Sequence, residues 1–249
     1  MARLKGLLKI EGTLDELTFY KSQDGHLVKT KGGVSANRIA SDPNFQRTRE
    51  NNSEFGSMAQ AGKLLRNVVR TLMMTASDGR VTARLTQLMS IIKNLDTTSI
   101  RGSRSVGVGI ADPLALAQLK NFNFNISAIL SSILYKPYVV TPATGVIDIT
   151  GLVPVNDIAF PSGATHLSIR GAFAVIDFAN NTSEIEYTNI ENLPIDGTVT
   201  TVTLTPAAVP KSAGTKMFLL AIEFFQEVNG VQYSMKNGSY NSLSIVEVA

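Results

Sequence analysis

The sequence predicts an α+β fold, in which an N-terminal β-hairpin and a helical hairpin precede an antiparallel, immunoglobulin-like β-sandwich. Two observations lead to this prediction. Near residue 135 the chain changes from a basic, helix-patterned stretch to apolar and Thr-rich segments separated by Pro, Gly and Asn turns. Strand-like segments at this spacing over about 110 residues are typical of a sandwich of immunoglobulin size. We therefore expect an N-terminal region at residues 1–134 and a β-sandwich at residues 135–249.

The first element is a β-hairpin. Strand-like segments at residues 17–20 and 26–29 flank the turn 22–25 (Ser-Gln-Asp-Gly), and Asp-Gly is frequent in tight hairpin turns. A further strand is expected at residues 7–10. A lone hairpin is marginally stable in water, so we expect it to pack against the helical segment or against a neighbouring subunit.

Two long helices follow the hairpin. Asp42-Pro43 predicts a helix start, because Asp is a favourable N-cap and Pro suits the first helical position. Apolar residues then recur at helical spacing to about residue 76 and again at residues 85–95, which predicts an antiparallel helical hairpin. Gly56 and Gly62 interrupt the first pattern and predict a break or a close contact between helices.

The next segment, residues 97–112, is expected to be a loop. Its stretch Gly102–Gly109 is superficially similar to a phosphate-binding loop, but the Gly-Lys-Ser/Thr ending is absent, so a flexible loop is the favoured interpretation. Asp112-Pro113 predicts a short helix at residues 113–119. Residues 121–125 alternate Asn with Phe and predict a strand or an extended linker.

After residue 135 the pattern predicts an all-β region. Turn signals such as Asp196-Gly197 and Asn229-Gly230 separate the strand-like segments, and the second of these gives the clearest hairpin in the chain. The expected strands are residues 138–141, 146–150, 165–178, 183–190, 198–205, 215–228, 231–236 and 242–248.

Composition excludes several kinds of chemistry. The 249 residues include no Cys, which excludes disulfides, thiol catalysis and thiolate metal sites. The two His residues are too few for a multi-histidine metal centre. Ser22, Asp24 and His26 occupy one exposed turn, where no scaffold holds them as a catalytic triad. We therefore expect neither an enzyme nor a cofactor.

The N-terminus gives an expectation about localisation. Lys5 and Lys9 interrupt its apolar run, so the core of a secretory signal is absent. No stretch approaches the roughly 18 apolar residues that span a bilayer. We expect synthesis in the cytoplasm and no membrane span, with release or export by a leaderless route as an alternative.

Charge is distributed unevenly along the chain. Residues 1–105 contain 17 Lys and Arg against 9 Asp and Glu, a net charge of +8, whereas residues 106–249 contain 6 against 11, a net charge of −5. The asymmetry allows docking of one half on the other within the chain, head-to-tail pairing of neighbouring copies, or nucleic-acid contact by the basic half. Docking within the chain is the favoured interpretation and nucleic acid the least favoured.

Seven charged residues form the candidate contact set. Glu50 and Glu54 are i,i+4 neighbours of like charge, which costs a few tenths of a kcal/mol unless Arg47, Arg49 or a partner offsets it. Farther along, Lys63, Arg66 and Arg70 form a basic stripe. We favour its interpretation as a solvent-exposed helix face, with contact to phosphate groups as the alternative. The candidates for assembly or polyanion contact are Arg47, Arg49, Glu50, Glu54, Lys63, Arg66 and Arg70.

Several short motifs carry a resemblance to a known family. They are Phe-Tyr-Lys at 19–21, Lys-Gly-Gly at 31–33, the run from Asp42-Pro43 through Arg-Thr-Arg-Glu-Asn at 47–51 to Glu-Phe-Gly at 54–56, Gln-Glu-Val-Asn-Gly at 226–230 and Lys-Asn-Gly-Ser-Tyr-Asn at 236–241. Together they resemble a family of uncharacterised proteins from Bacteroidetes-type bacteria, over nearly the whole chain. The resemblance implies a bacterial protein in which the helical and β parts belong together, and it implies no catalytic or binding residues.

These observations favour a non-enzymatic structural protein that associates with copies of itself into a filament, tube or lattice, as phage-tail-like tube proteins do by analogy. The sandwich edges could template pairing with other chains. A module whose sandwich loops bind a carbohydrate or a protein is the first alternative. Nucleic-acid binding through the basic helical half is the second.

Overall fold

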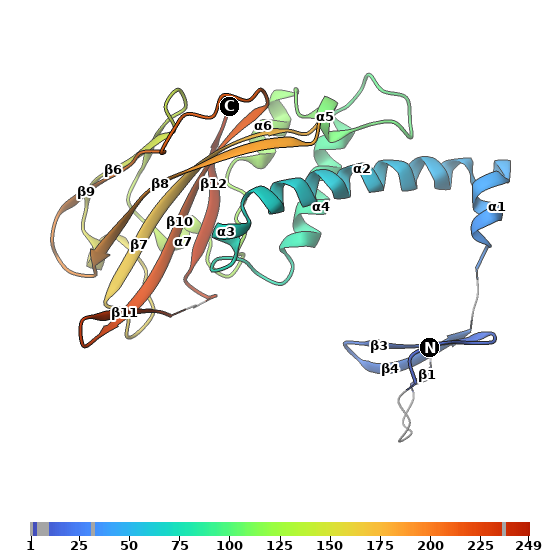
Figure 1. Cartoon of the computed structure of the whole chain (residues 1–249), viewed down its shortest axis with the longest axis horizontal. Helices are drawn as coiled ribbons and strands as arrows, with labels where there is room; N and C mark the ends of the chain where they lie inside the picture. The colour runs from blue at the N-terminus through green and yellow to red at the C-terminus, as the bar shows by residue number, and fades with distance from the viewer. Residues whose placement is uncertain (1, 4–9, 31–32, 236–237) are drawn as a thin grey trace. The chain divides into compact units, whose positions relative to one another are not determined.

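The computed structural model describes the whole chain except residues 1, 4–9, 31–32 and 236–237 (Figure 1). The chain divides into two compact units, Met1–Glu50 and Asn51–Ala249. The boundary predicted between residues 134 and 135 falls inside the second unit, where helices and strands share a hydrophobic core.

The first unit contains a small antiparallel sheet. Its strands lie in the order β1-β4-β3-β2, and their bounds are β1 (Ala2–Arg3), β2 (Gly12–Leu14), β3 (Leu17–Ser22) and β4 (Gly25–Thr30). The predicted hairpin is confirmed, because β3 and β4 pair from Leu17 opposite Thr30 to Ser22 opposite Gly25. The strand predicted at residues 7–10 lies mostly outside the described residues, and Ile10 is not in a strand.

Short helices follow this sheet. They are α1 (Ala36–Ser41) and the 3-10 helix η1 (Pro43–Phe45). The helix start predicted at Asp42-Pro43 is confirmed, since the Asp42 carboxylate accepts a hydrogen bond from the backbone N–H of Asn44. The long helix α2 (Gln46–Val68) begins in this unit and continues into the second.

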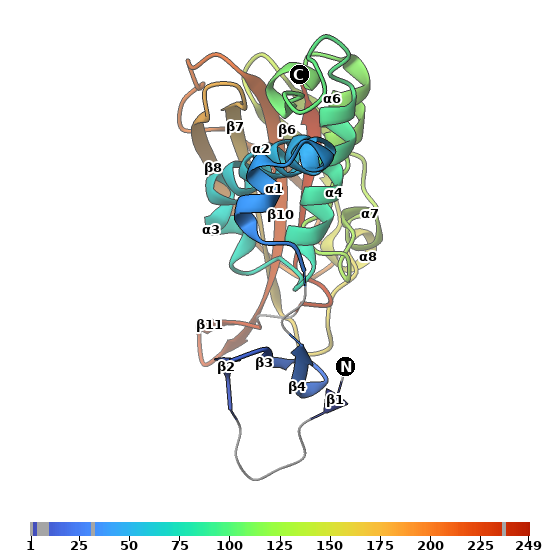
Figure 2. The same ribbon diagram turned by 90° about the vertical axis from the view of Figure 1, so that its right-hand side faces the viewer.

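The remaining helices belong to the second unit. They are α3 (Arg70–Met73), α4 (Val81–Asn94), α5 (Val106–Gly109), α6 (Pro113–Leu119), α7 (Leu130–Ile133) and α8 (Pro154–Asp157). Helices α2 and α4 cross at a steep angle (Figures 1 and 2), so the prediction of an antiparallel helical hairpin is wrong. A Cβ atom on Gly62 of α2 would lie 3.7 Å from Cγ of Met89 on α4, so the glycine marks the close helix contact that the sequence predicted.

Every strand predicted after residue 135 is present, and β8 is longer than predicted. The bounds are β5 (Val139–Thr141), β6 (Val146–Leu152), β7 (His166–Asp177), β8 (Thr182–Pro194), β9 (Thr200–Leu204), β10 (Thr215–Val228), β11 (Val231–Ser234) and β12 (Ser242–Val248). Asn229 and Gly230 both have positive φ, at 52° and 77°. Two-residue hairpin turns of this kind require positive φ at both positions, which explains why Asn-Gly predicted this hairpin well.

The strands form two antiparallel sheets that meet along β8. The larger sheet has the order β11-β10-β7-β8, with β12 also paired to β10, and the smaller has the order β5-β6-β9. A bridge between Thr188 and Pro206 joins β8 to the chain after β9, so the combined sheet curls into a half-barrel. The segment predicted as extended, residues 121–125, lies along β12, where the N–H of Phe124 donates to the carbonyl of Leu243 at 2.8 Å.

Helices cover one face of the larger sheet and the smaller sheet covers the other (Figures 1 and 2). Alternate residues of β7 therefore point into two cores: Ala174 and Ile176 pack against the helices, whereas Phe173 and Val175 pack against the smaller sheet. The prediction of a mixed fold with helices and antiparallel sheets is confirmed. The immunoglobulin-like arrangement stays a prediction.

Candidate functional site

The N-terminal sheet presents one apolar face. The pairing register places Leu14 opposite Leu17, and Phe19 opposite Val28, so all four side chains share a face. We call these four residues the apolar face of the N-terminal sheet. Leu14 is 67% exposed and Leu17 is 41% exposed, while Phe19 and Val28 are half-buried. This face is therefore an apolar surface that the unit's own described residues leave in contact with water.

The first unit buries few apolar side chains. Among its described residues, Leu27 on the opposite face is the one buried apolar side chain. A sheet of this size needs a packed face for stability, because hydrophobic burial has to offset the loss of chain entropy. The apolar face was not singled out from the sequence. The alternation of Leu17 and Phe19 with Thr18 and Tyr20 is the signal that could have identified it.

The first three residues of the predicted contact set make local contacts within the first unit. The guanidinium of Arg49 donates to the carbonyl oxygens of Ile39 and Asp42 at 2.7 and 3.0 Å. Arg47 forms an ion pair with Glu50 at 2.8 Å. Of the two arginines expected to offset the Glu50 charge, Arg47 does so, whereas Arg49 binds backbone carbonyls instead.

Glu54 lies in a different environment, because it is buried within the second unit. Its Oε2 is 2.6 Å from Nζ of Lys93 on α4, and both of its oxygens accept hydrogen bonds from Arg104 at 2.8 Å. Its Oε1 also accepts from the backbone N–H of Gly102 at 2.8 Å. The hydrogen bonds from Arg104, with those from Lys93 and Gly102, outweigh the effect of burial and lower the pKa of Glu54 to about 2. The carboxylate is therefore ionised and fully paired.

A second buried carboxylate, that of Asp96, binds the segment between α4 and α5. Burial would raise the pKa of Asp96, but hydrogen bonds from Ser99, Ser105 and Thr98 hold it well below its usual range. Together with Glu54, Asp96 fixes both ends of the segment between α4 and α5. The prediction of a loop over Gly102–Gly109 is confirmed for residues 102–105 and wrong for Val106–Gly109, which forms the helical turn α5. Hydrogen bonds from the backbone of Gly102 and Ser105 attach this segment to Glu54 and Asp96.

The glycines of this segment serve close packing. A Cβ atom on Gly109 would lie 2.1 Å from the carbonyl oxygen of Ile92, and one on Gly107 would lie 2.8 Å from Cα of Ala179. Only glycine lets the backbone of α5 approach α4 and the β7–β8 turn so closely. These contacts explain the glycine pattern without a phosphate ligand.

The basic stripe, Lys63, Arg66 and Arg70, is the last part of the predicted contact set. Lys63 and Arg70 are exposed and Arg66 is half-buried, along α2 and the start of α3. Within the part of the chain that the structure describes, these three side chains form no ion pair and no hydrogen bond. The stripe is thus available for contact with an anion or with the acidic surface of a partner.

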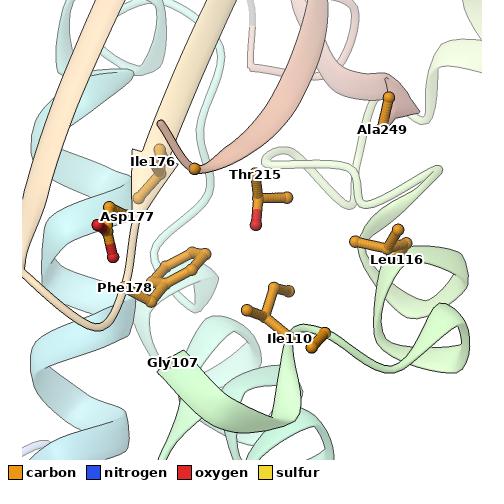
Figure 3. Close-up of a pocket in the computed structure, with 10 residues that line it drawn as sticks. Gly107, Ile110, Leu116, Ile176, Asp177, Phe178, Thr215 and Ala249 are labelled. Atoms are coloured by element: carbon orange, nitrogen blue, oxygen red, sulfur yellow. The ribbon is translucent and has the colours of Figure 1, made fainter. Parts of the chain in front are cut away.

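Figure 3 shows a pocket of about 360 Å³ where α5 and α6 meet the ends of β7 and β10. Ile110, Leu116 and Phe178 form apolar walls, and the hydroxyl of Thr215 points into the space between them. The carboxylate of Asp177 points away from this space, and hydrogen bonds from Asn180 and Ala179 lower its pKa. The pocket can therefore receive an apolar group, but it offers no pair of groups for acid–base chemistry.

The described residues contain no group of three or more His, Cys, Asp or Glu side chains that could hold a metal ion. None of the helices in the described chain has the length and apolar character needed to cross a membrane. Comparison with protein-family models, curated proteins and solved structures finds no match for this chain.

Proposed function

We propose that this chain is a non-enzymatic structural protein that assembles with copies of itself into a filament, tube or lattice. The apolar face of the N-terminal sheet is the observation that carries the proposal. Exposed apolar surface of this kind marks contact sites between proteins, and a sheet without a core of its own gains stability when a second protein covers it. A head-to-tail contact that does not close would generate a fibre.

Charge supports a second copy as the partner. The basic first 105 residues and the acidic remainder would attract each other between neighbouring copies. Because such attraction between exposed charges is screened by salt, assembly is expected to weaken as ionic strength rises.

Electron microscopy with light scattering across protein concentration tests this proposal. Regular polymers are expected from the native chain, and the double variant Leu14→Lys, Leu17→Lys is expected to remain monomeric. Ile100→Lys is the matched control, because Ile100 is 79% exposed but lies in the second unit. A native chain that is monomeric at every concentration would exclude autonomous assembly.

Nucleic-acid binding is a second candidate function, favoured only by the unpaired basic stripe. It predicts binding that weakens steeply with salt and that is abolished by Arg66→Glu with Arg70→Glu. Binding that survives both reversals would exclude the stripe as the contact. We rank this function below self-assembly because the stripe carries no aromatic side chains for base stacking.

Four finer expectations also belong to the proposal: the immunoglobulin-like arrangement of the strands, kinship with the Bacteroidetes-type family, binding of a carbohydrate or protein by the loops of the β region, and synthesis in the cytoplasm with leaderless release as the alternative. The motif-based resemblance supports the second of these.

A further inference from the structure

The larger sheet carries a second pocket where its helix-covered face runs beyond the helices. On β7 and β10, side chains such as Ala172, Ala174 and Ala221 lie under the helical layer. The next positions on the same face belong to Arg170 and Glu223, which follow at the two-residue period of a strand. The pocket has a volume of about 120 Å³ and is lined by Ser168, Arg170, Ile190, Ala221, Glu223 and Phe225.

Arg170 is the unusual member of this pocket. Its Nε is buried and has no hydrogen-bond partner among the described residues. The guanidinium carbon lies 4.3 Å from the centroid of the Tyr187 ring. A buried donor that stays unpaired is costly, and an acceptor on a ligand would remove that cost at Nε.

A β-bulge builds this arrangement. Between Arg170 and Ala172 the register with β8 shifts, so that Ile190 lies opposite Arg170 and Tyr187 lies opposite Ala172. The extra residue in β8 brings Tyr187 and Ile190 to the same face, although three positions separate them. Bulges commonly re-aim side chains at functional sites, and here the bulge supplies both the ring beside the guanidinium and one apolar wall.

Glu223 and Ser168 complete the polar part. Oε1 of Glu223 accepts a hydrogen bond from the hydroxyl of Thr75 at 2.6 Å, which fixes the carboxylate at the end of the helical layer. Oγ of Ser168 accepts from the side-chain amide of Asn192 at 3.0 Å, which leaves the hydroxyl proton of Ser168 free to be donated. Within the described chain no ion pair joins Arg170 to Glu223. The pocket therefore presents a cation and an anion that are not joined in an ion pair.

We propose that this pocket binds a small α-amino acid. The carboxylate of the ligand binds the guanidinium of Arg170, whose planar fork matches two carboxylate oxygens. The ammonium group of the ligand binds Glu223, and an apolar side chain packs against Ile190 and Phe225. A simple anion would meet repulsion from Glu223 and a simple cation repulsion from Arg170, so the zwitterion is the chemistry that the pocket selects.

Calorimetric titration of the full-length chain tests this assignment. L-alanine, L-valine and L-leucine are the probes, with acetate and ethylamine as single-charge controls. At least one amino acid is expected to bind with a Kd of about 1 mM or tighter, and each control at least about tenfold more weakly. Acetate that binds as well as the amino acids would overturn the zwitterion assignment, and failure of all three amino acids to bind would overturn the site.

Variants locate the binding. Arg170→Lys keeps the charge but removes the fork, and Glu223→Gln removes the anion; each is expected to weaken amino-acid binding at least about tenfold. Lys216→Met is the matched control, because Lys216 is exposed on β10 outside the pocket. Thermal melting establishes that each variant is folded. Binding that is unchanged in folded Arg170→Lys and Glu223→Gln would place the ligand elsewhere. The outcome is independent of self-assembly, because the pocket and the apolar face of the N-terminal sheet share no residue.

Discussion

Glu54 and Lys93 form a buried ion pair, 2.6 Å between Oε2 and Nζ, although 39 positions separate them in the chain. Their side chains are 4% and 8% exposed. Arg104 shares the same carboxylate, so one anion on α2 pairs with a cation on α4 and with another in the segment after it. Removing this anion would leave a buried cation without a partner, which makes Glu54 the strongest test of what holds these elements together.

Glu54→Gln is expected to destabilise the second unit by about 3–5 kcal/mol, because breaking one side of a buried ion pair leaves an uncompensated charge. Urea denaturation followed by circular dichroism measures this change. Glu50→Gln is the matched control, since its partner Arg47 is 68% exposed and surface ion pairs contribute about 0–1 kcal/mol. Equal losses in the two variants would contradict the special role of Glu54.

The same carboxylate predicts a dependence of stability on pH. The pKa of Glu54 falls from its ordinary 4.5 to about 2 in the folded chain, so folding favours the ionised form. Its contribution is therefore complete above pH 4.5 and is lost as pH falls from 4.5 towards 2. The difference in unfolding free energy between the native chain and Glu54→Gln is expected to shrink over this interval. A difference that stays constant between pH 6 and pH 2.5 would show that Glu54 does not titrate as described.

Gly109→Ala is expected to cost about 1–3 kcal/mol or more, because the new methyl group would overlap the carbonyl oxygen of Ile92. Gly56→Ala offers the opposite outcome. Gly56 lies inside α2 with no neighbouring atom within 4 Å of a new Cβ, so alanine is expected to stabilise the helix by about 1 kcal/mol. Melting temperatures of the two variants should therefore move in opposite directions. A neutral Gly109→Ala would mean that α5 can move away from α4.

The sequence predicts elements that depend on local signals better than contacts between distant residues. Strands and turns after residue 135 follow local rules, and Asn229-Gly230 satisfies its turn by its own backbone preferences. Long-range partners leave no such local signal. The sequence identifies Glu54 only as an i,i+4 neighbour of Glu50 with the same charge. Its ion-pair partners Lys93 and Arg104 lie far away in the sequence and can be identified only from the fold. The pocket at Arg170 depends on a bulge whose position the spacing of apolar residues does not reveal.

Asn241→Ala is expected to destabilise the second unit by about 2–3 kcal/mol. The side chain of Asn241 is fully buried, donates to the carbonyl of Thr75 at 3.1 Å and accepts from the N–H of Phe224 at 3.3 Å. Its loss would leave both backbone groups unpaired in the interior. Asn192→Ala is the control, because Asn192 is exposed and water can replace its partners. Denaturant titration of the two variants compares the losses, and similar small values would show that water also reaches Asn241.

Residues 42–249 are expected to fold without the preceding chain and to lose the capacity to assemble. Both hydrophobic cores consist of residues after position 60, so this fragment keeps them intact together with the Asp42 cap. Removal of the N-terminal sheet takes away the proposed contact face but no core residue. Cooperative thermal unfolding and a monomeric mass in light scattering are the expected results. A fragment that unfolds without cooperativity would show that the first 41 residues stabilise the second unit. A fragment that still forms polymers would exclude the apolar face of the N-terminal sheet as the assembly contact and would direct attention to the edges of the larger sheet.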